Sequence, residues 1–513
     1  MPFGTDKDGL EGAGQMARLR VLAATASIAS IAFTAGWALP ASAGTSAGSS
    51  AYSEPTWWQK FLTVSAPGFQ PPPSPGKTGS VKVGSNIDMS NEPTPQSETS
   101  IAIDPSRPSQ VVGGSNEIVR LPMRGYFSSD GGSTWGAVDL PLPPPLNGSG
   151  TDFGSDPSVA WDTRGNVYYA YIVVFFNQNF HAVTGTEVAV ARSSDAGHTW
   201  ASTFFNFNSG TGKFNDKPYI AVDTNPGSPF RDTVYVAWDN ASNNNGKSSA
   251  NDVILVSRSA DGGRTFSTPV AASGTGSGPR AVIGADPFVA PDGTLHVAWH
   301  DVQANAIVEA SSADGGQSFG PTTISPTQVA FDVAIPAQAS RHALVYPACG
   351  ADTSGGPNRG TLYCSWMDET SSNGTDIFVS RSTDNGVSWS APLRVNDDPA
   401  GVANDQFNQW LAVDPSDGSV NLSWNDTRND PAHLSTDIFY ARSTDGGLSF
   451  TKNVQVTTAP TNETCCGADL GDQYGDYEGI AAMDGSIHPI WTDRRAAVAS
   501  LDEEIFTATI TVK

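Results

Sequence analysis

The chain has 513 residues, with 52 Asp and Glu against 28 Lys and Arg and a formal net charge of −24. This excess of carboxylates repels nucleic-acid phosphates and anionic membrane surfaces, so we expect neither as a partner. The 52 Gly, the 36 Pro and a charged fraction of only 16% are typical of a turn-rich β protein.

The first 43 residues have the order of a secretory signal. Arg18 and Arg20 precede an apolar run from 21 to 39, and Ala41-Ser42-Ala43 follows, which predicts cleavage after Ala43. Translation from Met16 would omit the acidic residues that precede the run. An uncleaved membrane anchor is the alternative, because the run is nearly long enough to span. We expect a secreted, extracellular protein with no membrane span in its mature form.

Residues 44–77 are rich in Pro, Ser and Gly and predict a disordered linker. Residues 78–513 then carry a repeated unit. Six segments fit the pattern S-x-D-x-G-x-x-(W/F): Ser128 to Trp135, Ser193 to Trp200, Ser259 to Phe266, Ser312 to Phe319, Ser382 to Trp389 and Ser443 to Phe450. Short β-rich runs flank each segment, and such a period of several short strands per unit is typical of propeller blades.

Two further strands precede each box, and a last set of three strands without a box ends the chain. The run Ser80-Val81-Lys82-Val83 precedes the first unit and predicts the missing fourth strand of that last set. The expected fold is therefore all-β: a single propeller of four-stranded antiparallel blades, closed by an N-terminal strand. Seven blades are favoured, with six as the alternative.

Four cysteines fit an oxidising compartment. Cys349 and Cys364 lie on two strands predicted to be adjacent and antiparallel, which predicts a disulfide. Cys465 and Cys466 are consecutive, and the alternatives are a vicinal bridge or free thiols. No cysteine pair has the spacing of a zinc site.

Strand alternation sorts the repeated residues onto two rims. The boxes form the turns on one rim, where we expect their aspartates to bond their own turn backbone: Asp130, Asp195, Asp261, Asp314, Asp384 and Asp445. The other rim is expected to carry strand-initial acids such as Glu98, Asp156 and Asp286. Trp-x-Asp sequences end several second strands there, and two of these continue to Arg428 and Arg494.

Residues that break the repeat on this second rim are the candidates for function, because ligands bind where a few polar groups converge. They include Asp405, Asp472, the run Asp476-Tyr477-Glu478, Arg428, Arg494 and, in the first unit, Arg120. No nucleophile elbow, zinc-protease, Walker or dinucleotide motif is present.

The six boxes resemble the Asp-box repeats, also called bacterial neuraminidase repeats, of the sialidase superfamily, over about Ser80 to Lys513. The resemblance implies a glycoside hydrolase of exo-sialidase type that acts on extracellular glycans or glycoconjugates. It implies Tyr477 and Glu478 as nucleophile and base, and Asp476 or Asp426 as the acid. The residues assigned to substrate binding are Arg428, Arg494, Arg120, Asp405 and Asp493. Members of the family carry an arginine, in an Arg-Ile-Pro motif, at the start of the first strand of the repeat. That strand has no arginine here, and the similar tripeptide Arg120-Leu121-Pro122 falls instead just before the first box.

Two other functions stay open at this point. One is a non-catalytic propeller that binds glycans or proteins, and the other is a polysaccharide lyase, which needs a Tyr or His base. No cofactor is required for any of them. Calcium is compatible with the clustered Asp residues, although no D-x-D-x-D-G loop is present and the metal content stays unknown. We expect a monomer.

Overall fold

A computed structural model describes residues 81–92, 95–118, 120–146, 152–176, 183–209, 213–241, 252–274, 281–329, 331–370, 374–399, 402–465, 467–470, 472–495 and 503–512. The expected signal (1–43) and linker (44–77) lie outside the described residues. No described segment forms a helix with the length and apolar character that a membrane crossing needs.

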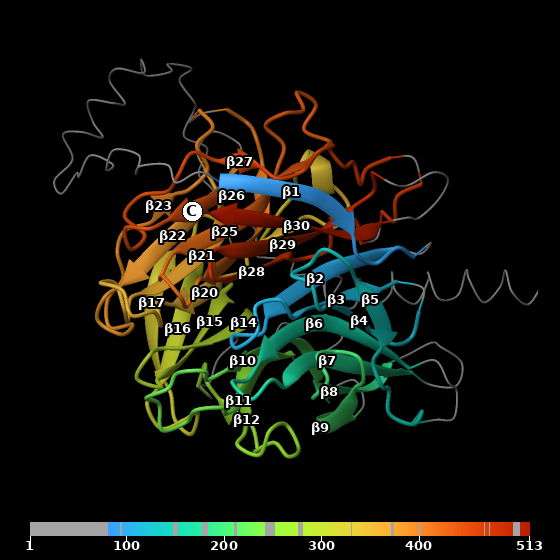
Figure 1. Ribbon diagram of the computed structural model, residues 1–513, viewed down its shortest axis with the longest axis vertical. Coiled ribbons are helices and arrows are strands. Elements are labelled where there is room, and N and C mark those ends of the chain that lie inside the picture. The colour runs from blue at the N-terminus through green and yellow to red at the C-terminus, as the bar shows by residue number, and fades with distance from the viewer. Residues whose placement is uncertain are drawn as a thin grey trace, which may run out of the picture.

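Seven four-stranded antiparallel sheets follow one another around the molecule as propeller blades (Figure 1). The first three are β2 (Gln96–Ile103), β3 (Val111–Glu117), β4 (Arg124–Ser128), β5 (Gly136–Asp139); β6 (Phe153–Trp161), β7 (Val167–Phe176), β8 (Val183–Ser193), β9 (Ala201–Ser209); and β10 (Phe214–Val222), β11 (Val234–Ala241), β12 (Val253–Ser259), β13 (Val270–Ala271).

The next three blades repeat the same order. They are β14 (Val282–Val289), β15 (Leu295–Asp301), β16 (Ala306–Ser312), β17 (Gly320–Pro326); β20 (Ala348–Ala351), β21 (Leu362–Glu369), β22 (Thr375–Ser382), β23 (Leu393–Arg394); and β24 (Gln406–Val413), β25 (Val420–Asp426), β26 (Asp437–Ser443), β27 (Val454–Gln455).

The seventh blade joins the two ends of the described chain. It consists of β28 (Gly479–Met483), β29 (Ser486–Asp493), β30 (Glu504–Val512) and, on its outer edge, β1 (Val81–Asp88). Val81 pairs with Val512 and Asp88 with Phe506, so blue β1 lies beside red β30 in Figure 1. Seven blades and closure by an N-terminal strand are therefore confirmed.

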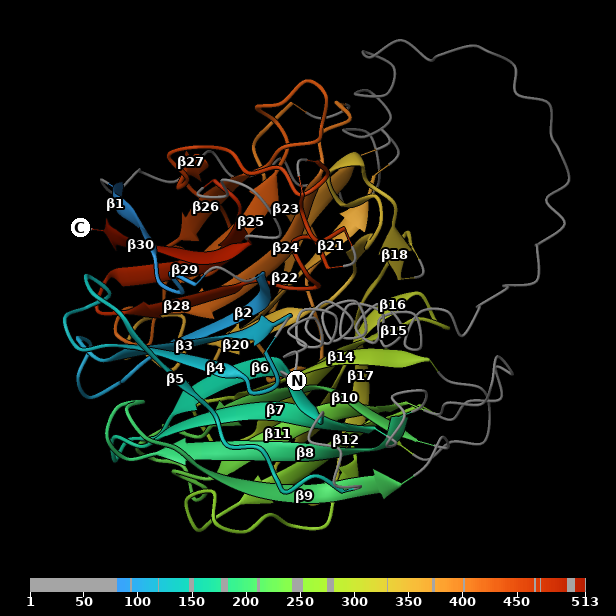
Figure 2. The ribbon, with the colours of Figure 1, turned by 90° about the vertical axis from the view of Figure 1, so that its right-hand side faces the viewer.

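Residues 331–347, here called the insertion, interrupt the repeat between the fourth and fifth blades. They contain the short hairpin of β18 (Asp332–Val333) and β19 (Ala343–Leu344), with the 3₁₀ turn η1 (Pro336–Gln338) between its strands. Figure 2 shows β18 to the right of β21, and the hairpin forms a sheet of its own, separate from the seven blades. The sequence analysis predicted no such element.

Burial explains why the middle strands are so apolar. Every residue of β7 is buried, whereas the outer strand β9 of the same blade is mostly half-buried or exposed. A middle strand has a neighbouring blade on each face of its sheet, so both of its faces are covered and strict alternation disappears. Tyr168 of β7 and Trp238 of β11 belong to one apolar cluster that bridges two blades.

The six boxes form the turns between the third and fourth strands of their blades. In the first, Asp130 accepts hydrogen bonds from the hydroxyls of Ser128 and Thr134 and from the amide of Thr134. These bonds from Thr134 lower the pKa of Asp130 to about 2. In each of the other five boxes the aspartate accepts the equivalent two hydroxyl bonds, from the serine two residues before it and from a threonine or serine four residues after it. The Gly131 amide also donates to Ser109 in the turn between β2 and β3, which places both turns at one rim, the box rim.

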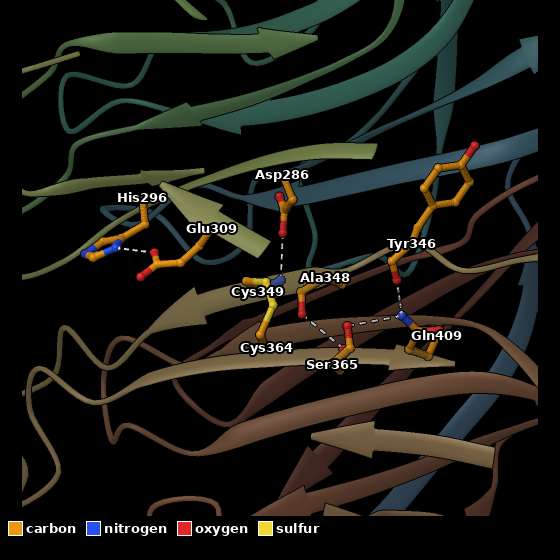
Figure 3. Close-up of a disulfide and its surroundings, with 9 residues drawn as sticks. All are labelled: Asp286, His296, Glu309, Tyr346, Ala348, Cys349, Cys364, Ser365 and Gln409. Carbon is orange, nitrogen blue, oxygen red and sulfur yellow. Dashed lines mark hydrogen bonds and ion pairs between the residues drawn. A yellow bond between two sulfur atoms is a disulfide. The ribbon is translucent and has the colours of Figure 1, made fainter. Parts of the chain in front are cut away.

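The inner edge of the fifth blade carries a disulfide. Cys349 of β20 and Cys364 of β21 pair directly across the two strands and are bonded to each other. In Figure 3 the carboxylate of Asp286, from the fourth blade, accepts a hydrogen bond from the Cys349 amide at 2.6 Å. Cys465 is disulfide-bonded as well, and Cys466 lies outside the described residues.

Candidate functional site

A β-bulge interrupts the inner strand of five blades near its first residues. The pairing register breaks around Glu98, Asp156, Lys217, Gly284 and Asn408. Each of these residues has a positive φ, between 45° and 79°, which non-glycine residues rarely adopt. Such conformations persist only where the surrounding structure holds them, and they are concentrated at functional sites.

Side chains from separate blades meet at the end of the inner strands away from the boxes. Glu98 comes from the first blade, Lys217 from the third, Asp472 and Asp476 from the segment before the seventh, and Arg341 from the insertion. We call these five residues the axial cluster. Blades one and three are not neighbours, so contact between their residues places the cluster at the propeller axis.

Asp476 is the centre of the axial cluster. Lys217 Nζ contacts one carboxylate oxygen of Asp476, and Arg341 Nε contacts the other at 2.6 Å. The side chains of Asp476 and Lys217 are only 0% and 4% exposed. Burial alone would raise the pKa of Asp476, but the two cations lower it below its ordinary value and keep the carboxylate ionised.

Glu98 shares both cations with Asp476. Its Oε1 lies 3.2 Å from Arg341 Nη2 and 3.9 Å from Lys217 Nζ, and its Oε2 accepts a hydrogen bond from Asn116 Nδ2 at 2.5 Å. Burial raises the pKa of Glu98 well above its ordinary value, against the opposing charges of Lys217 and Arg341. The pKa values of the two carboxyls that share these cations are therefore shifted in opposite directions.

More acids with raised pKa values surround this pair. Asp472 contacts Arg341 Nη1 at 3.7 Å and accepts a hydrogen bond from the Ser97 hydroxyl. Burial raises the pKa of Asp472 to about 6, against the pull of Arg341. Burial and the neighbouring Asp156 raise the pKa of Asp216 to about 8.

Aromatic rings surround Lys217 in the axial cluster. Lys217 Nζ lies 5.4 Å from the Tyr346 ring centroid and 5.2 Å from that of Tyr477, both within cation–π range. Tyr219 packs against Trp410 and Tyr477 with centroids 5.3 and 5.4 Å apart. Such rings offer flat apolar surface with polar edges.

The insertion is hydrogen-bonded to the segment that precedes the seventh blade. The amides of Ser340 and Arg341 donate to Gln473 Oε1 at 3.1 and 3.0 Å, and Gln338 Nε2 donates to the Gly475 carbonyl at 3.0 Å. These bonds hold the stretch from Gln338 to Arg341 against the segment that carries Asp472 and Asp476.

The predicted run Asp476-Tyr477-Glu478 is divided by the structure. Asp476 and the Tyr477 ring belong to the axial surroundings. Glu478 instead accepts hydrogen bonds from the Thr99 hydroxyl at 3.1 Å and from the Thr492 amide at 3.1 Å. The Tyr477 hydroxyl faces the Pro157 carbonyl at 3.5 Å. No hydrogen bond between Tyr477 and Glu478 is found among these described contacts.

Three of the predicted rim residues, Asp426, Arg428 and Asp493, belong to a repeated Trp-x-Asp-x-Arg unit. Trp424 Nε1 donates to Asp426 at 2.9 Å, and Arg428 Nε donates to the same carboxylate at 2.9 Å. The seventh blade repeats the unit with Trp491, Asp493 and Arg495, at 2.8 Å for both bonds. The cation equivalent to Arg428 is therefore Arg495 rather than Arg494.

The three predicted arginines contact different acids. Arg428 pairs with Asp426 and with Asp397, Arg494 with Glu503 at 3.2 Å, and Arg120 with Glu92 and Asp139. Asp405 accepts none of these arginines in the bonds described; its amide donates to the Thr427 hydroxyl, and burial raises its pKa to about 7. The structure does not bring these predicted residues together.

Sequence reasoning named Asp472 and Asp476 but missed Lys217 and Arg341. Lys217-Pro218 stands where Asp156-Pro157 stands one blade earlier, and this shared step is the signal that could have found Lys217. Asp286, which the sequence aligned with Asp156, lies two residues beyond Gly284 at the equivalent bulge. Arg341 lies in the insertion, where no repeat pattern exists.

Among the described residues, no three His, Cys, Asp or Glu side chains are grouped so as to hold a metal ion.

Fold and site together define a seven-bladed β-propeller with buried charges at its axis. No protein-family model matches the sequence. No curated protein matches it either. Solved structures do resemble it. A protein of unknown function from Dyadobacter fermentans is 15% identical, with 70% of this chain and 95% of that chain covered and a TM-score of 0.44.

Two enzymes show a similar likeness. The leech intramolecular trans-sialidase is 13% identical over 73% of this chain and 71% of its own, with a TM-score of 0.44. The α-L-arabinanase of Penicillium chrysogenum is 10% identical over 84% of this chain and 98% of its own, with a TM-score of 0.43. A likeness of this strength assigns no activity to the chain.

Proposed function

We propose that this protein is a carbohydrate-active propeller, a glycoside hydrolase whose carboxyl pair is Glu98 and Asp476. The observation that carries the proposal is a pair of buried carboxyls that contact the same two cations, Lys217 and Arg341. Burial raises the pKa of Glu98, whereas the two cations lower that of Asp476. Glycoside hydrolysis needs one carboxylic acid and one carboxylate, and environments that separate two pKa values mark such roles.

In the proposed reaction Glu98 gives its proton to the glycosidic oxygen as the bond from that oxygen to the anomeric carbon breaks. Ionised Asp476 stabilises the positive charge that develops on the sugar ring. Water then adds to the anomeric carbon and returns a proton to Glu98. Lys217 and Arg341 hold Asp476 in its ionised form throughout.

Access to the pair requires movement of the insertion. Glu98 is 2% and Asp476 is 1% exposed, and Arg341 lies against both. Closed active sites that open on the microsecond to millisecond scale are common in hydrolases, since closure excludes water from the reacting groups.

The test is a panel of fluorogenic glycosides with wild type, Glu98→Gln and Asp476→Asn. Loss of general acid catalysis is expected to lower kcat/KM about 10²–10⁴-fold in Glu98→Gln, with an unchanged circular dichroism spectrum. Asp417→Asn is the matched control, because Asp417 pairs with Arg442 on the box rim. Full activity of Glu98→Gln would remove this residue from the reaction.

A non-catalytic glycan-binding propeller is the second candidate. It is favoured by the full occupation of Asp476, since each of its two oxygens already contacts a cation. No turnover across the panel together with binding on a glycan array would decide for this candidate.

We also propose that the protein is exported. The predicted signal over residues 1–43 supports this, and its test is mass spectrometry of the N-terminus from culture medium. A chain that begins at residue 44 is expected. Retention of residues 1–43 in the membrane fraction would instead support the uncleaved anchor.

A further inference from the structure

We infer that the site takes an uncharged sugar and discriminates against sugars that bear a carboxylate. This inference rests on the proposed function and specifies its substrate class. It is argued from the contacts of the cations, because recognition of a sugar carboxylate needs a cation whose hydrogen-bond donors are available, as in bidentate arginine pairs.

Arg341 has its guanidinium surrounded by carboxyls of the protein. Nε contacts Asp476 at 2.6 Å, Nη2 contacts Glu98 at 3.2 Å and Nη1 contacts Asp472 at 3.7 Å. Each of the three nitrogens therefore faces an acid already. A sugar carboxylate could reach Arg341 only by displacing one of these acids.

Lys217 also contacts acids of the protein already. Its Nζ contacts Asp476 and lies 3.9 Å from Glu98, and its remaining surroundings include the rings of Tyr346 and Tyr477. Displacing Asp476 from Lys217 would leave a buried carboxylate beside the incoming one, and like charges in a poorly solvated place repel strongly.

Arginines elsewhere do not supply the missing cation. Among the described residues, Arg428, Arg495 and Arg394 each pair with at least one aspartate of their own blade. An anionic sugar would therefore enter a site in which each cation already contacts an acid of the protein. The hydroxyls of a neutral sugar can both donate to the carboxylates and accept from the cations.

The experiment compares matched 4-methylumbelliferyl glycosides that differ only at the sixth carbon, a hexoside and its hexuronide, together with a sialoside and neutral pentosides. We expect kcat/KM at least 100-fold higher for the best neutral sugar than for any acidic one. Faster cleavage of the sialoside or hexuronide overturns this inference and leaves the hydrolase proposal standing.

Absence of turnover on the whole panel counts against the hydrolase proposal instead. The inference is then decided on a glycan array. Binding confined to neutral glycans supports it, whereas preference for sialylated or uronate-bearing glycans overturns it. Absence of binding to any glycan overturns both proposals.

A variant sharpens the test, whether the readout is turnover or binding. Asp472 is the cluster acid with the most exposed side chain, at 16%, against 2% for Glu98 and 0% for Asp476. Asp472→Asn removes one charge from Arg341, so the preference for neutral over acidic sugars is expected to fall about 10-fold, the effect of roughly one lost charge–charge interaction. Asp417→Asn makes the same charge change on the box rim and should leave the preference unchanged. An unchanged preference in Asp472→Asn contradicts the role assigned to Arg341.

Discussion

The Asp boxes and the axial cluster place acidic residues at opposite rims of the propeller, in different physical environments. Box aspartates such as Asp195 are exposed, and the groups that bond them lie within four residues of sequence. Asp476 is buried, and its partner Lys217 is 259 residues away. The box rim is a set of local turns that forms repeatedly, whereas the axial cluster forms once and only in the complete ring.

This difference also sets the protonation of the two groups. Hydrogen bonds to the ionised form lower the pKa of the box acids, and burial raises the pKa of most acids near the axis. Acid and alkali should therefore weaken different ends of the molecule.

The largest effect is expected from Lys217→Met. The substitution leaves buried Asp476 with only Arg341, and removal of one partner from a buried ion pair typically costs about 3–5 kcal/mol. The free energy of unfolding from urea titration measures this loss. Arg107→Met is the matched control, because Arg107 pairs with Asp104 at the box rim and is 53% exposed. A loss below about 1 kcal/mol is expected for that pair.

Equal losses of unfolding free energy in Lys217→Met and Arg107→Met would contradict the proposed difference between the axial cluster and the box rim. They would show that the pairs at the axis are as well solvated as those at the box rim.

A smaller effect is expected in the pH dependence of Asp286→Asn. Burial raises the pKa of Asp286 to about 8 in the folded protein, against an ordinary value of about 3.9 in the unfolded chain. The folded state binds more protons between these values, so the unfolding free energy falls as pH rises from about 4 to 8. The variant lacks this titration, and its decrease in Tm between pH 5 and pH 8 should be smaller than that of wild type by about 2 °C.

Thermal unfolding at several pH values provides the measurement for Asp286. Identical pH profiles for wild type and variant would mean that the carboxyl of Asp286 is ionised in the folded protein.

The smallest effect is expected at a single box. Slight burial raises the pKa of Asp195, but hydrogen bonds from Ser193 and Thr199 lower it to about 2. A lowered folded pKa stabilises the fold above about pH 4, and this contribution is lost as pH falls through about 2. Asp195→Ala should lose about 1 kcal/mol or less at pH 7, because solvent screens the exposed carboxylate.

The difference between wild type and Asp195→Ala should disappear near pH 2 when both are unfolded with urea. A difference that persists there would assign the loss to packing of the turn rather than to the carboxylate.

The sequence predicted the fold well because blade formation depends on local signals. Each box repeats the same serine, aspartate and glycine at fixed spacing, and the run at Val81 has the pattern of a strand without a blade of its own. Seven blades and their closure followed from counting these signals. The insertion was missed because its two-residue strands are too short to form a pattern.

The site was predicted only in part. Asp476 and Asp472 were found because they interrupt the repeat, but no local pattern indicates that Lys217 contacts Asp476 or that Arg341 reaches both acids. Arg428 and Arg494 were chosen as residues that break the repeat. The structure shows instead that Arg428 and Arg495 belong to a repeated Trp-x-Asp-x-Arg unit, in which the aspartate lies two residues away. An acid and an arginine so close in sequence at the end of a strand brace that strand end locally, whereas the axial contacts join residues from distant blades.

Pairing of β1 with β30 has a consequence for biosynthesis. Strand β1, the first of the described strands, cannot pair with β30 until residues 504–512 have been made, so the ring stays open while six blades are already complete. Because Val81 and Val512 face each other, a short linker between them would allow new ends in any exposed turn. Such a permuted chain would form its seventh blade from consecutive residues, so no strand would have to stay unpaired until the rest of the chain has been made.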